Sequence, residues 1–352
     1  MELLSVTMND GVKPRSEIEG KDNSSEDKSN YKIVRKGDMV YNSMRMWQGA
    51  NGISPCDGIV SPAYTVLMPK QEINNGYFAA LFKSTNLINE FRKNSQGMTS
   101  DTWNLKYPQI ETIKVQIPSV SEQDKVSALF SVLDARIVVQ AQLVESLKKY
   151  KRGLLSQLIA QKKAFDTSGE WKTVKLGHIF KERTERAKGN ETLLAVTISN
   201  GVQRRDEIDL KDNSSDDKSN YKCVYIGDIA YNTMRMWQGA SGVSPYNGIV
   251  SPAYTIVTPI RPDLHNMTFW AYYFKYSPLV QTFQKYSQGL TSDTWNLKFP
   301  QFSEIAVTMP PISEQDKIAE CLSVFDEHCK CEDEKLQALL QVRTSLLQQL
   351  FI

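Results

Sequence analysis

The chain contains the same long segment twice. Residues 11–69 and 201–259 are identical at about 40 of 59 positions, with a constant offset of 190. After a two-residue insertion the match resumes with an offset of 192, where SQGMTSDTWNLKYPQ (95–109) returns as SQGLTSDTWNLKFPQ (287–301). This period is far longer than the roughly 20–50 residues of solenoid repeats. The chain is therefore a duplicated domain, and both copies are expected to adopt the same fold.

Each copy begins with a part that mixes strand and helix patterns. Short β-branched and aromatic runs such as DMVYNSM, GIVSPAYTVLM and IETIKVQIP lie between Gly, Asn, Asp and Pro residues, which favours strands joined by turns. A helical pattern covers 75–93 and again 267–285. We therefore expect an α+β fold with two repeated domains, one at 1–118 and one at 161–310.

Each domain is followed by a predicted long helix, at 119–160 and at 311–352. The helices are expected to open with Ser121 and Ser313 as N-caps. At roughly 38 residues each, they would be roughly 57 Å long. Apolar residues recur at alternating spacings of four and three, which is a heptad seam broken in both copies at matching positions, Gln140 with Glu332 and Lys151 with Arg343.

The seam must be buried against another surface. We predict that the two helices pair as an antiparallel coiled coil; homodimerisation, or packing of each helix on its own domain, are the alternatives. The residues predicted to make this pairing are Phe130, Leu133, Leu147, Leu154, Leu322, Phe325, Leu339 and Leu346.

The sequence contains no complete catalytic or metal-binding motif. SPAY at 61–64 and 251–254 is similar to the base-gripping motif of amino-methylating DNA methyltransferases, but no glycine-rich cofactor loop precedes it, so we interpret it as a core strand. His328, Cys329 and Cys331 lie close together, yet a zinc site needs four ligands and Cys329 falls on the seam, so we interpret it as a core cysteine. We predict no catalytic residue and no metal site.

The composition excludes several classes of protein. An odd count of five cysteines argues against a disulfide framework, and the chain start has no signal-peptide pattern. No apolar run approaches the roughly 18–20 residues of a membrane span, so we expect no membrane partner and a cytoplasmic location. A net charge of +2 neither demands nor excludes a nucleic-acid partner.

Polar loops shared by the two copies are the best candidates for binding. YNSMRMWQGANG (41–52) and SQGMTSDTWNLK (95–106) combine arginine, glutamine, asparagine and lysine, and KDNSSEDKSNYK (21–32) is flanked by lysines. Arginine reads guanine edges, Asn and Gln read adenine edges, and Lys, Ser and Thr hold phosphates. We interpret Trp47 and Trp103 as core residues. The predicted DNA-binding residues are Lys28, Asn42, Arg45, Gln48, Gln96, Thr99, Asn104 and Lys106, with their counterparts Lys218, Asn232, Arg235, Gln238, Gln288, Thr291, Asn296 and Lys298.

The order of these parts resembles the specificity subunit of a Type I DNA restriction–modification system. The resemblance rests on IPSVSEQDKVSALFSVLD (117–134) with MPPISEQDKIAECLSVFD (309–326), on the helix ends 146–159 and 338–351, and on WKTVKLGHIF (171–180). It implies two target-recognition domains, each reading half of a split double-stranded DNA site, and paired helices that act as a spacer. It also implies two docked modification subunits, and restriction subunits that join them. S-adenosylmethionine, ATP and Mg would belong to those partners, so no cofactor is expected in this chain.

Three other classes of protein are alternatives to a specificity subunit. A stand-alone enzyme would need the missing cofactor loop, and a DNA mimic would be strongly acidic. A coiled-coil adaptor without DNA binding would explain the helices but not the duplicated polar loops. A DNA-binding protein acting outside restriction–modification stays open as an alternative. Salt-dependent binding to duplex DNA would distinguish a specificity subunit from a coiled-coil adaptor.

The two copies differ at their start. The lead-in segment, residues 171–190, has no counterpart in the first copy, where Met1 aligns with Glu191. We expect that the first domain lacks an edge strand, either because the gene is shortened or because an upstream start lies outside this sequence.

The matched loops predict the symmetry of the DNA target. MRMWQGA and TSDTWNLK are identical in the two copies, and identical side chains in identical frames should prefer the same base edges. Antiparallel helices would present the domains through an approximate twofold, which predicts an interrupted inverted repeat. Helices of roughly 57 Å span about 17 base pairs at ~3.4 Å per pair, which bounds the site to about one and a half turns.

Overall fold

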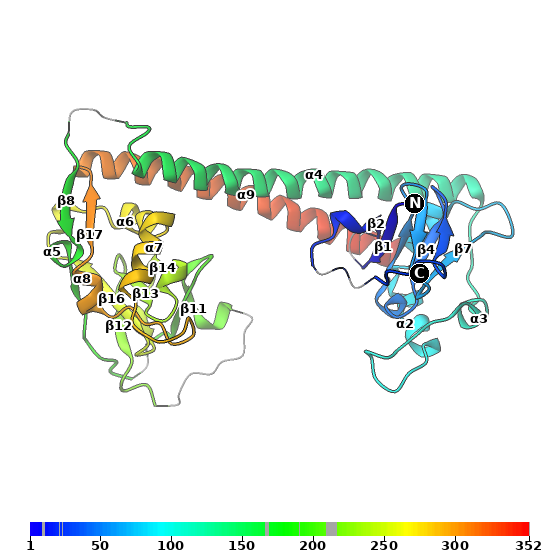
Figure 1. Ribbon diagram of the computed structural model, residues 1–352, viewed down its shortest axis with the longest axis horizontal. Coiled ribbons are helices and arrows are strands. Elements are labelled where there is room, and N and C mark those ends of the chain that lie inside the picture. Colours follow the sequence, from blue (N-terminus) through cyan, green and yellow to red (C-terminus); the bar gives the residue numbers. More distant parts are fainter. Residues whose placement is uncertain are drawn as a thin grey trace. The chain divides into compact units, whose positions relative to one another are not determined.

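The computed structural model describes residues 1–8, 11–20, 22, 24–165, 169–189, 191–208 and 217–351. The residues fall into two compact units, unit 1 (Met1–Leu143 with Glu332–Ile352) and unit 2 (Val144–Cys331). Each unit holds one copy of the repeated domain and half of each long helix, α4 (Val120–Ile159) and α9 (Ile312–Leu350). Figure 1 labels these elements. The two repeated α+β domains and their long helices confirm the predicted fold class.

Unit 1 is built on two small sheets with strand orders β2-β1-β6-β3 and β5-β4-β7. Two helices and a single helical turn follow the sheets. The bounds are β1 Leu3–Thr7, β2 Gly11–Pro14, β3 Lys32–Val34, β4 Met39–Asn42, β5 Asn51–Ile53, β6 Gly58–Val60, β7 Tyr64–Leu67, α1 Asn75–Leu81, α2 Thr85–Asn94 and α3 Tyr107–Ile110.

Unit 2 repeats this order and adds elements at its edge. The counterparts are β10 Leu194–Thr197, β11 Gly201–Arg204, β12 Lys222–Val224, β13 Ile229–Asn232, β14 Ser241–Val243, β15 Gly248–Val250, β16 Tyr254–Pro259, α6 Met267–Tyr273, α7 Ser277–Tyr286 and α8 Phe299–Ser303. The additional elements are β8 Lys172–Lys175, α5 Leu176–Ile179, β9 Phe180–Glu182 and β17 Ala306–Met309. The lead-in segment therefore forms two strands and a helical turn, with β9 on the edge of the sheet β14-β13-β16-β9 and β8 paired to β17.

Short 3-10 turns connect these elements in both units. They are η1 Arg15–Glu17, η2 Met46–Gln48, η3 Arg205–Glu207, η4 Met236–Gln238 and η5 Pro262–Leu264.

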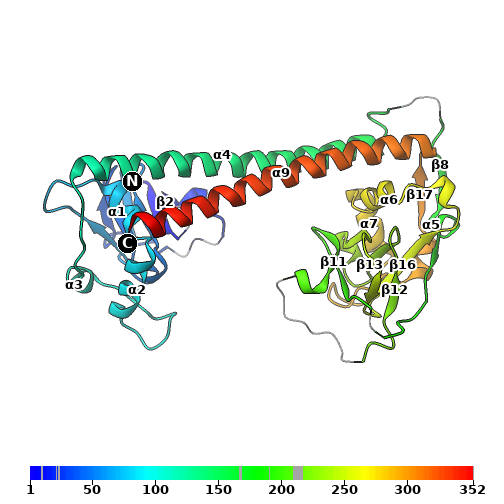
Figure 2. The same ribbon diagram turned by 180° about the vertical axis from the view of Figure 1, so that it is seen from behind.

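The long helices pair antiparallel within each unit (Figure 1 and Figure 2). In unit 1 the ring of Phe130 stacks on that of Phe351, with centroids 6.0 Å apart. In unit 2 the rings of Tyr150 and Phe325 lie 5.4 Å apart. Phe130 and Leu322 are buried, and the other predicted seam residues are half-buried: Leu133, Leu147, Leu154, Phe325, Leu339 and Leu346.

The polar breaks in the seam pair with one another. Gln140 Nε2 donates to Glu332 Oε2 over 2.8 Å, and these two residues occupy the same position in the two copies. Arg343 pairs with Asp134 in unit 1, and the equivalent pair in unit 2 joins Lys151 to Asp326. A residue that bonds its own counterpart, flanked by two equivalent ion pairs, is the pattern that antiparallel pairing of two copies requires.

The SEQDK motif joins each long helix to its domain. Gln123 is buried; its Oε1 accepts from the Asn74 backbone N–H at 2.9 Å, and its Nε2 donates to the Pro118 carbonyl. Asn74 caps α1 by accepting from Tyr77 N–H at 3.0 Å, while its Nδ2 donates to Asp124. In unit 2 Gln315, Asn266 and Asp316 make the same bonds. The motif therefore fixes the angle at which the domain meets its helix.

The predicted N-cap residues are wrong, because each long helix begins just before the predicted serine. Helix α4 begins at Val120, and Ser119 accepts from the Glu122 N–H through its side chain. Helix α9 begins at Ile312, and the Pro311 carbonyl accepts from the Glu314 N–H. Ser121 and Ser313 lie inside the first turn instead. In α4, Ser119 already stands three residues before Glu122 in a capping-box arrangement.

Helix α4 also carries a stripe of exposed apolar residues beside the seam. Leu129, Val132, Val139 and Leu143 are all exposed, with Val132 at 70%. An 18-residue window of this helix reaches a mean hydropathy of 1.4, so by length and composition α4 could cross a membrane, contrary to the expectation from sequence. One such helix is weak evidence for a span, and the largely half-buried seam together with this stripe accounts for its apolar content.

Candidate nucleic-acid interface

Loop A (residues 41–52) is a tight connection between β4 and β5. Asn42 Oδ1 accepts from the Met44 N–H at 3.0 Å, and Gly49 has the left-handed φ of 82° that closes the turn. The Ala50 N–H donates to the carbonyl of Arg45, so the loop backbone is hydrogen-bonded to itself. The loop therefore holds the Arg45 side chain, which is 42% exposed, on a rigid base.

Loop B (residues 95–106) is a hairpin that follows α2. Gln96 and Asn104 exchange both backbone hydrogen bonds, at 3.0 and 2.8 Å. Gly97 has φ of 147°, and a Cβ there would lie 2.6 Å from the Thr102 carbonyl, so glycine is required. Thr102 Oγ1 bonds the backbone of Thr99 in both directions, which closes the tip.

The structure brings loop A and loop B together. The rings of Trp47 and Trp103 meet edge to face, with centroids 5.1 Å apart. The Leu105 N–H donates to the Ser43 carbonyl at 2.8 Å, which ties the base of one loop to the other. Arg45 Nη1 lies 3.9 Å from Asp101 Oδ1. The two tryptophans are half-buried and brace the loops against each other, so they are less enclosed than core residues.

The second copy reproduces this geometry in loop A′ (231–242) and loop B′ (287–298). Trp237 and Trp295 lie 5.2 Å apart, again edge to face. Gly239 has φ of 81°, and the φ/ψ pair of Arg235 is −129°/9° against −127°/9° for Arg45. Gln288 and Asn296 form the same bridge. The local frames of the two copies are therefore nearly identical.

Most predicted DNA-binding residues lie on these paired loops. The exposed ones are Gln96, Thr99, Lys106, Arg235, Gln238, Gln288, Thr291 and Lys298. The half-buried ones are Asn42, Arg45, Gln48, Asn104, Asn232 and Asn296. The side-chain oxygens Oδ1 of Asn104 and Asn296 are buried and accept no hydrogen bond from any residue that the structure describes. An amide held this way in both copies has acceptor capacity to spare.

Lys28 and Lys218 lie on a different part of each domain. Lys28 Nζ donates to the Ser25 carbonyl at 2.9 Å and lies over the Tyr31 ring, and Lys218 lies over the Tyr221 ring. The hydrogen bond from the Ser29 backbone lowers the pKa of the neighbouring Asp27, so that carboxylate stays charged beside the lysine. Residues 21, 23 and 211–216 of this predicted segment lie outside the described residues.

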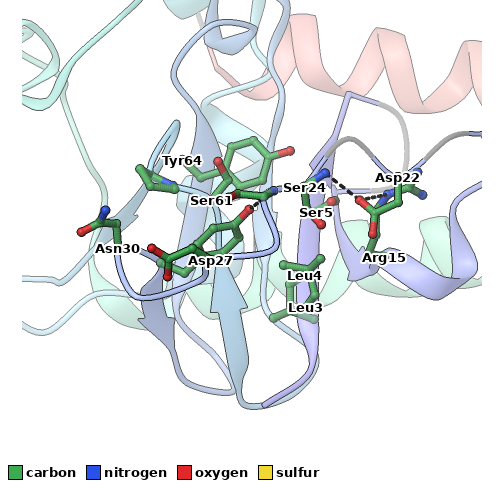
Figure 3. Close-up of a pocket in the computed structure, with 13 residues that line it drawn as sticks. Leu3, Leu4, Ser5, Arg15, Asp22, Ser24, Asp27, Asn30, Ser61 and Tyr64 are labelled. Carbon is green, nitrogen blue, oxygen red and sulfur yellow. Dashed lines mark hydrogen bonds and ion pairs between the residues drawn. The ribbon is translucent and has the colours of Figure 1, made fainter.

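The SPAY motif lines a polar hollow in unit 1 (Figure 3). The hollow has a volume of about 520 Å³, and Arg15, Asp22, Asp27, Ser61 and Tyr64 are among its lining residues. The Ala63 N–H donates to Ser61 Oγ in a turn, and the strand β7 begins only at Tyr64, so the interpretation of SPAY as a core strand is wrong for its first three residues. The proline in a serine-initiated turn explains the difference.

The tips of loops B and B′ carry residues that the sequence analysis missed. Met98 and Leu290 are fully exposed, directly after the glycine of positive φ in each loop. A glycine followed by an apolar residue in an otherwise polar loop is the signal that could have found them. Apolar side chains at such tips can wedge between base steps of DNA.

The comparisons with known proteins agree with this architecture. The family model of the Type I restriction modification DNA specificity domain matches residues 5–149 and 168–341. A solved Type-I restriction-modification system S subunit from M. genitalium is 16% identical over 91% of this chain and 84% of that chain, with a TM-score of 0.56. A chain from a structure describing complex assembly and conformational transition of the type I R-M system is 15% identical over 92% of this chain and 83% of that chain, with a TM-score of 0.53. Repeated domains with paired loops, antiparallel helices and a family model over most of the length lead to one conclusion: the chain belongs to the Type I restriction–modification DNA specificity family.

Proposed function

We propose that this chain is the DNA-recognition subunit of a Type I restriction–modification complex, and that its two domains read two related halves of a split double-stranded site. The observation that carries the proposal is the near-identity of the paired loops in the two copies, in sequence and in backbone geometry. Side chains presented in the same local frame prefer the same base edges. The site is then an interrupted inverted repeat.

Direct reading of bases falls to the long side chains of the loops. Arg45 and Arg235 can each present a guanidinium fork to a guanine, while Gln96 and Gln288 can read adenine. Lys106 and Lys298 stand at the far ends of loops B and B′, where they can contact phosphates. The Trp47–Trp103 contact supports this surface by holding the two loops at one spacing.

The chemistry belongs to partner subunits in this proposal. The chain itself neither methylates nor cuts DNA; modification subunits bring S-adenosylmethionine, and restriction subunits bring ATP and Mg. The exposed stripe of α4, with Leu129, Val132, Val139 and Leu143, supports a docking role because contiguous exposed apolar residues mark interaction surfaces. A complex that acts on cellular DNA belongs in the cytoplasm.

Mapping of methylated bases tests the proposal. The chain is expressed with the modification subunit encoded beside it, and methylated adenines are located by sequencing that reports modified bases. We expect two half-sites that are reverse complements across an unspecified spacer. Two unrelated half-sites would contradict the shared-loop argument, and methyl transfer by the purified chain alone would contradict the non-catalytic role.

Matched variants assign each half-site to a domain. Arg45→Ala should relax one specified base pair in one half-site, at a cost of about 1–3 kcal/mol of discrimination. Arg235→Ala should relax the equivalent base pair in the other half-site and leave the first unchanged. The same change in both half-sites from one variant would refute the one-domain, one-half-site assignment.

A further inference from the structure

In unit 2 the side chain of Tyr272 joins α6 to the two long helices. Its hydroxyl donates to Asp326 Oδ2 at 2.5 Å and lies 3.3 Å from Ser323 Oγ, both on α9. Lys151 Nζ of α4 lies 4.7 Å from the centre of the tyrosine ring. Burial first, and then the bond to Asp326, raises the pKa of Tyr272, so the phenol stays protonated and donates. A carboxylate, a hydroxyl and a cation therefore hold this ring together.

Unit 1 keeps these three partners but has Ala80 in place of the tyrosine. At the offset of 192 residues, the counterparts are Asp134 for Asp326, Ser131 for Ser323 and Arg343 for Lys151. The Arg343 Nε donates to Asp134 Oδ1 at 2.5 Å, as the lysine does to the equivalent oxygen in unit 2. The second carboxylate oxygen of Asp134 accepts a longer bond of 3.3 Å from Arg343 Nη2, and a carboxylate oxygen can accept more than one bond. The acceptor that a phenol needs is therefore in place.

A hollow of about 630 Å³ lies beside Ala80. Its lining residues include the three counterparts and apolar side chains of both long helices: Ser131, Asp134, Arg343, Phe130, Ile137 and Leu340. All of these residues belong to unit 1. The volume lies within the range of small-molecule sites, which is about 300–1,000 Å³.

Small residues on α1 leave the hollow open. Gly76, Ala79 and Ala80 all line it. In unit 2 the first and third of these positions hold Thr268 and Tyr272. The difference between the copies is therefore a missing ring, next to polar groups that hold such a ring in the other copy.

We propose that the hollow of unit 1 binds a small phenol, with its ring beside Ala80 in the place that Tyr272 takes in unit 2. The hydroxyl of the ligand donates to Asp134 and lies beside Ser131. The Arg343 guanidinium takes the role of the Lys151 ammonium and places a cation next to the ring. The volume beyond one ring accommodates substituents.

Calorimetric titration of the full chain with 4-methylphenol, the free equivalent of a tyrosine side chain, tests the proposal. We expect saturable binding at one site per chain. Toluene has the same ring without the hydroxyl, so it should bind about fivefold more weakly, because the bond to the carboxylate is lost. Equal or tighter binding of toluene would overturn the assignment of Asp134 as the acceptor and with it the proposal.

Exchanging one residue between the copies gives matched variants. Ala80→Tyr places the ring in the hollow covalently, so binding of 4-methylphenol should be lost without a fall in the melting temperature. Tyr272→Ala opens the equivalent space in unit 2, so the number of sites per chain should rise to two. Misfolding cannot create a site, so this variant keeps the test decisive if Ala80→Tyr does not fold. Val132→Ala, on the exposed stripe of α4, is the control and should bind as the wild type does.

Several outcomes would overturn the proposal. They are no saturable binding up to about 10 mM ligand, unchanged binding by a folded Ala80→Tyr variant, and a single site in Tyr272→Ala. If the wild type binds no free phenol and Ala80→Tyr no longer co-purifies with a modification subunit, the occupant is a protein side chain, which also refutes a small-molecule site. Each outcome leaves the DNA-recognition function standing, because none of these measurements involves DNA.

Discussion

Truncation of Phe130 should destabilise unit 1 selectively. Phe130 is 4% exposed, stacks on Phe351 across the helix pair and lies in the apolar core that also holds Tyr77 and Leu347. Removing a buried phenylalanine side chain costs about 3–5 kcal/mol, because the surrounding side chains fill the cavity only partly. The site lies between two helices that can approach each other, so the lower end, about 3 kcal/mol, applies.

Calorimetry and hydrogen exchange measure this effect. For a domain of this size each kcal/mol shifts the melting temperature by about 2–4 °C, so Phe130→Ala should lower the unit 1 transition by about 6–12 °C. Exchange should accelerate around 126–134 and 346–351. Leu322→Ala, at the equivalent position and fully buried, should instead weaken unit 2.

An exposed residue of the same helix is the control. Val132 is 70% exposed on the opposite face of α4, so Val132→Ala should change stability by less than about 0.5 kcal/mol. If Phe130→Ala and Val132→Ala have the same melting temperature, the seam does not contribute the stability assigned to it. If Phe130→Ala accelerates exchange equally in both units, the units do not unfold separately.

The remaining predictions concern the seam, the pH response and the DNA contacts. Leu133→Asp or Phe325→Asp places a carboxylate in the helix seam, so stability should fall by several kcal/mol together with partner docking, as read by calorimetry and co-purification; normal assembly of both variants would place the seam elsewhere. Burial beside Trp270 lowers the pKa of His265, so the unfolded chain takes up a proton first as pH falls below about 6.5, and stability should drop by at most about 1.4 kcal/mol per pH unit. His265→Ile, which installs the residue of the first copy, should abolish that part of the slope in pH-dependent melts, and an unchanged slope would assign it to other groups. Lys106→Ala should weaken DNA binding across all sequences and reduce the slope of log affinity against log salt by about one, as seen in titrations at several salt concentrations; a change confined to one sequence would make Lys106 a base reader.

Antiparallel pairing could be predicted because it depends on a local pattern. The heptad spacing from Val126 to Leu158 is encoded in consecutive residues, and the duplication supplies a partner with the same pattern in the same chain. The structure adds that the polar residues interrupting the two seams, Gln140 of α4 and Glu332 of α9, are hydrogen-bonded to each other.

The candidate loops could be found from the repeat, but their geometry could not. Identity between copies marks residues 44–50 and 99–106 without saying that Trp47 would meet Trp103. Contacts between residues more than fifty positions apart depend on how strands and helices pack, and nothing in either loop alone encodes them. The exposure of Met98 at the loop tip is decided in the same way.

The duplication, the α+β domains, the long paired helices and the family could all be predicted from the amino-acid sequence, because periodicity and repeated motifs can be seen in the order of the residues alone. Two features follow from packing instead: Gln123 clamps the domain to its helix, and the first SPAY residues form a turn. Burial and hydrogen-bond partnership are properties of the packed chain, since each depends on residues that come together only on folding.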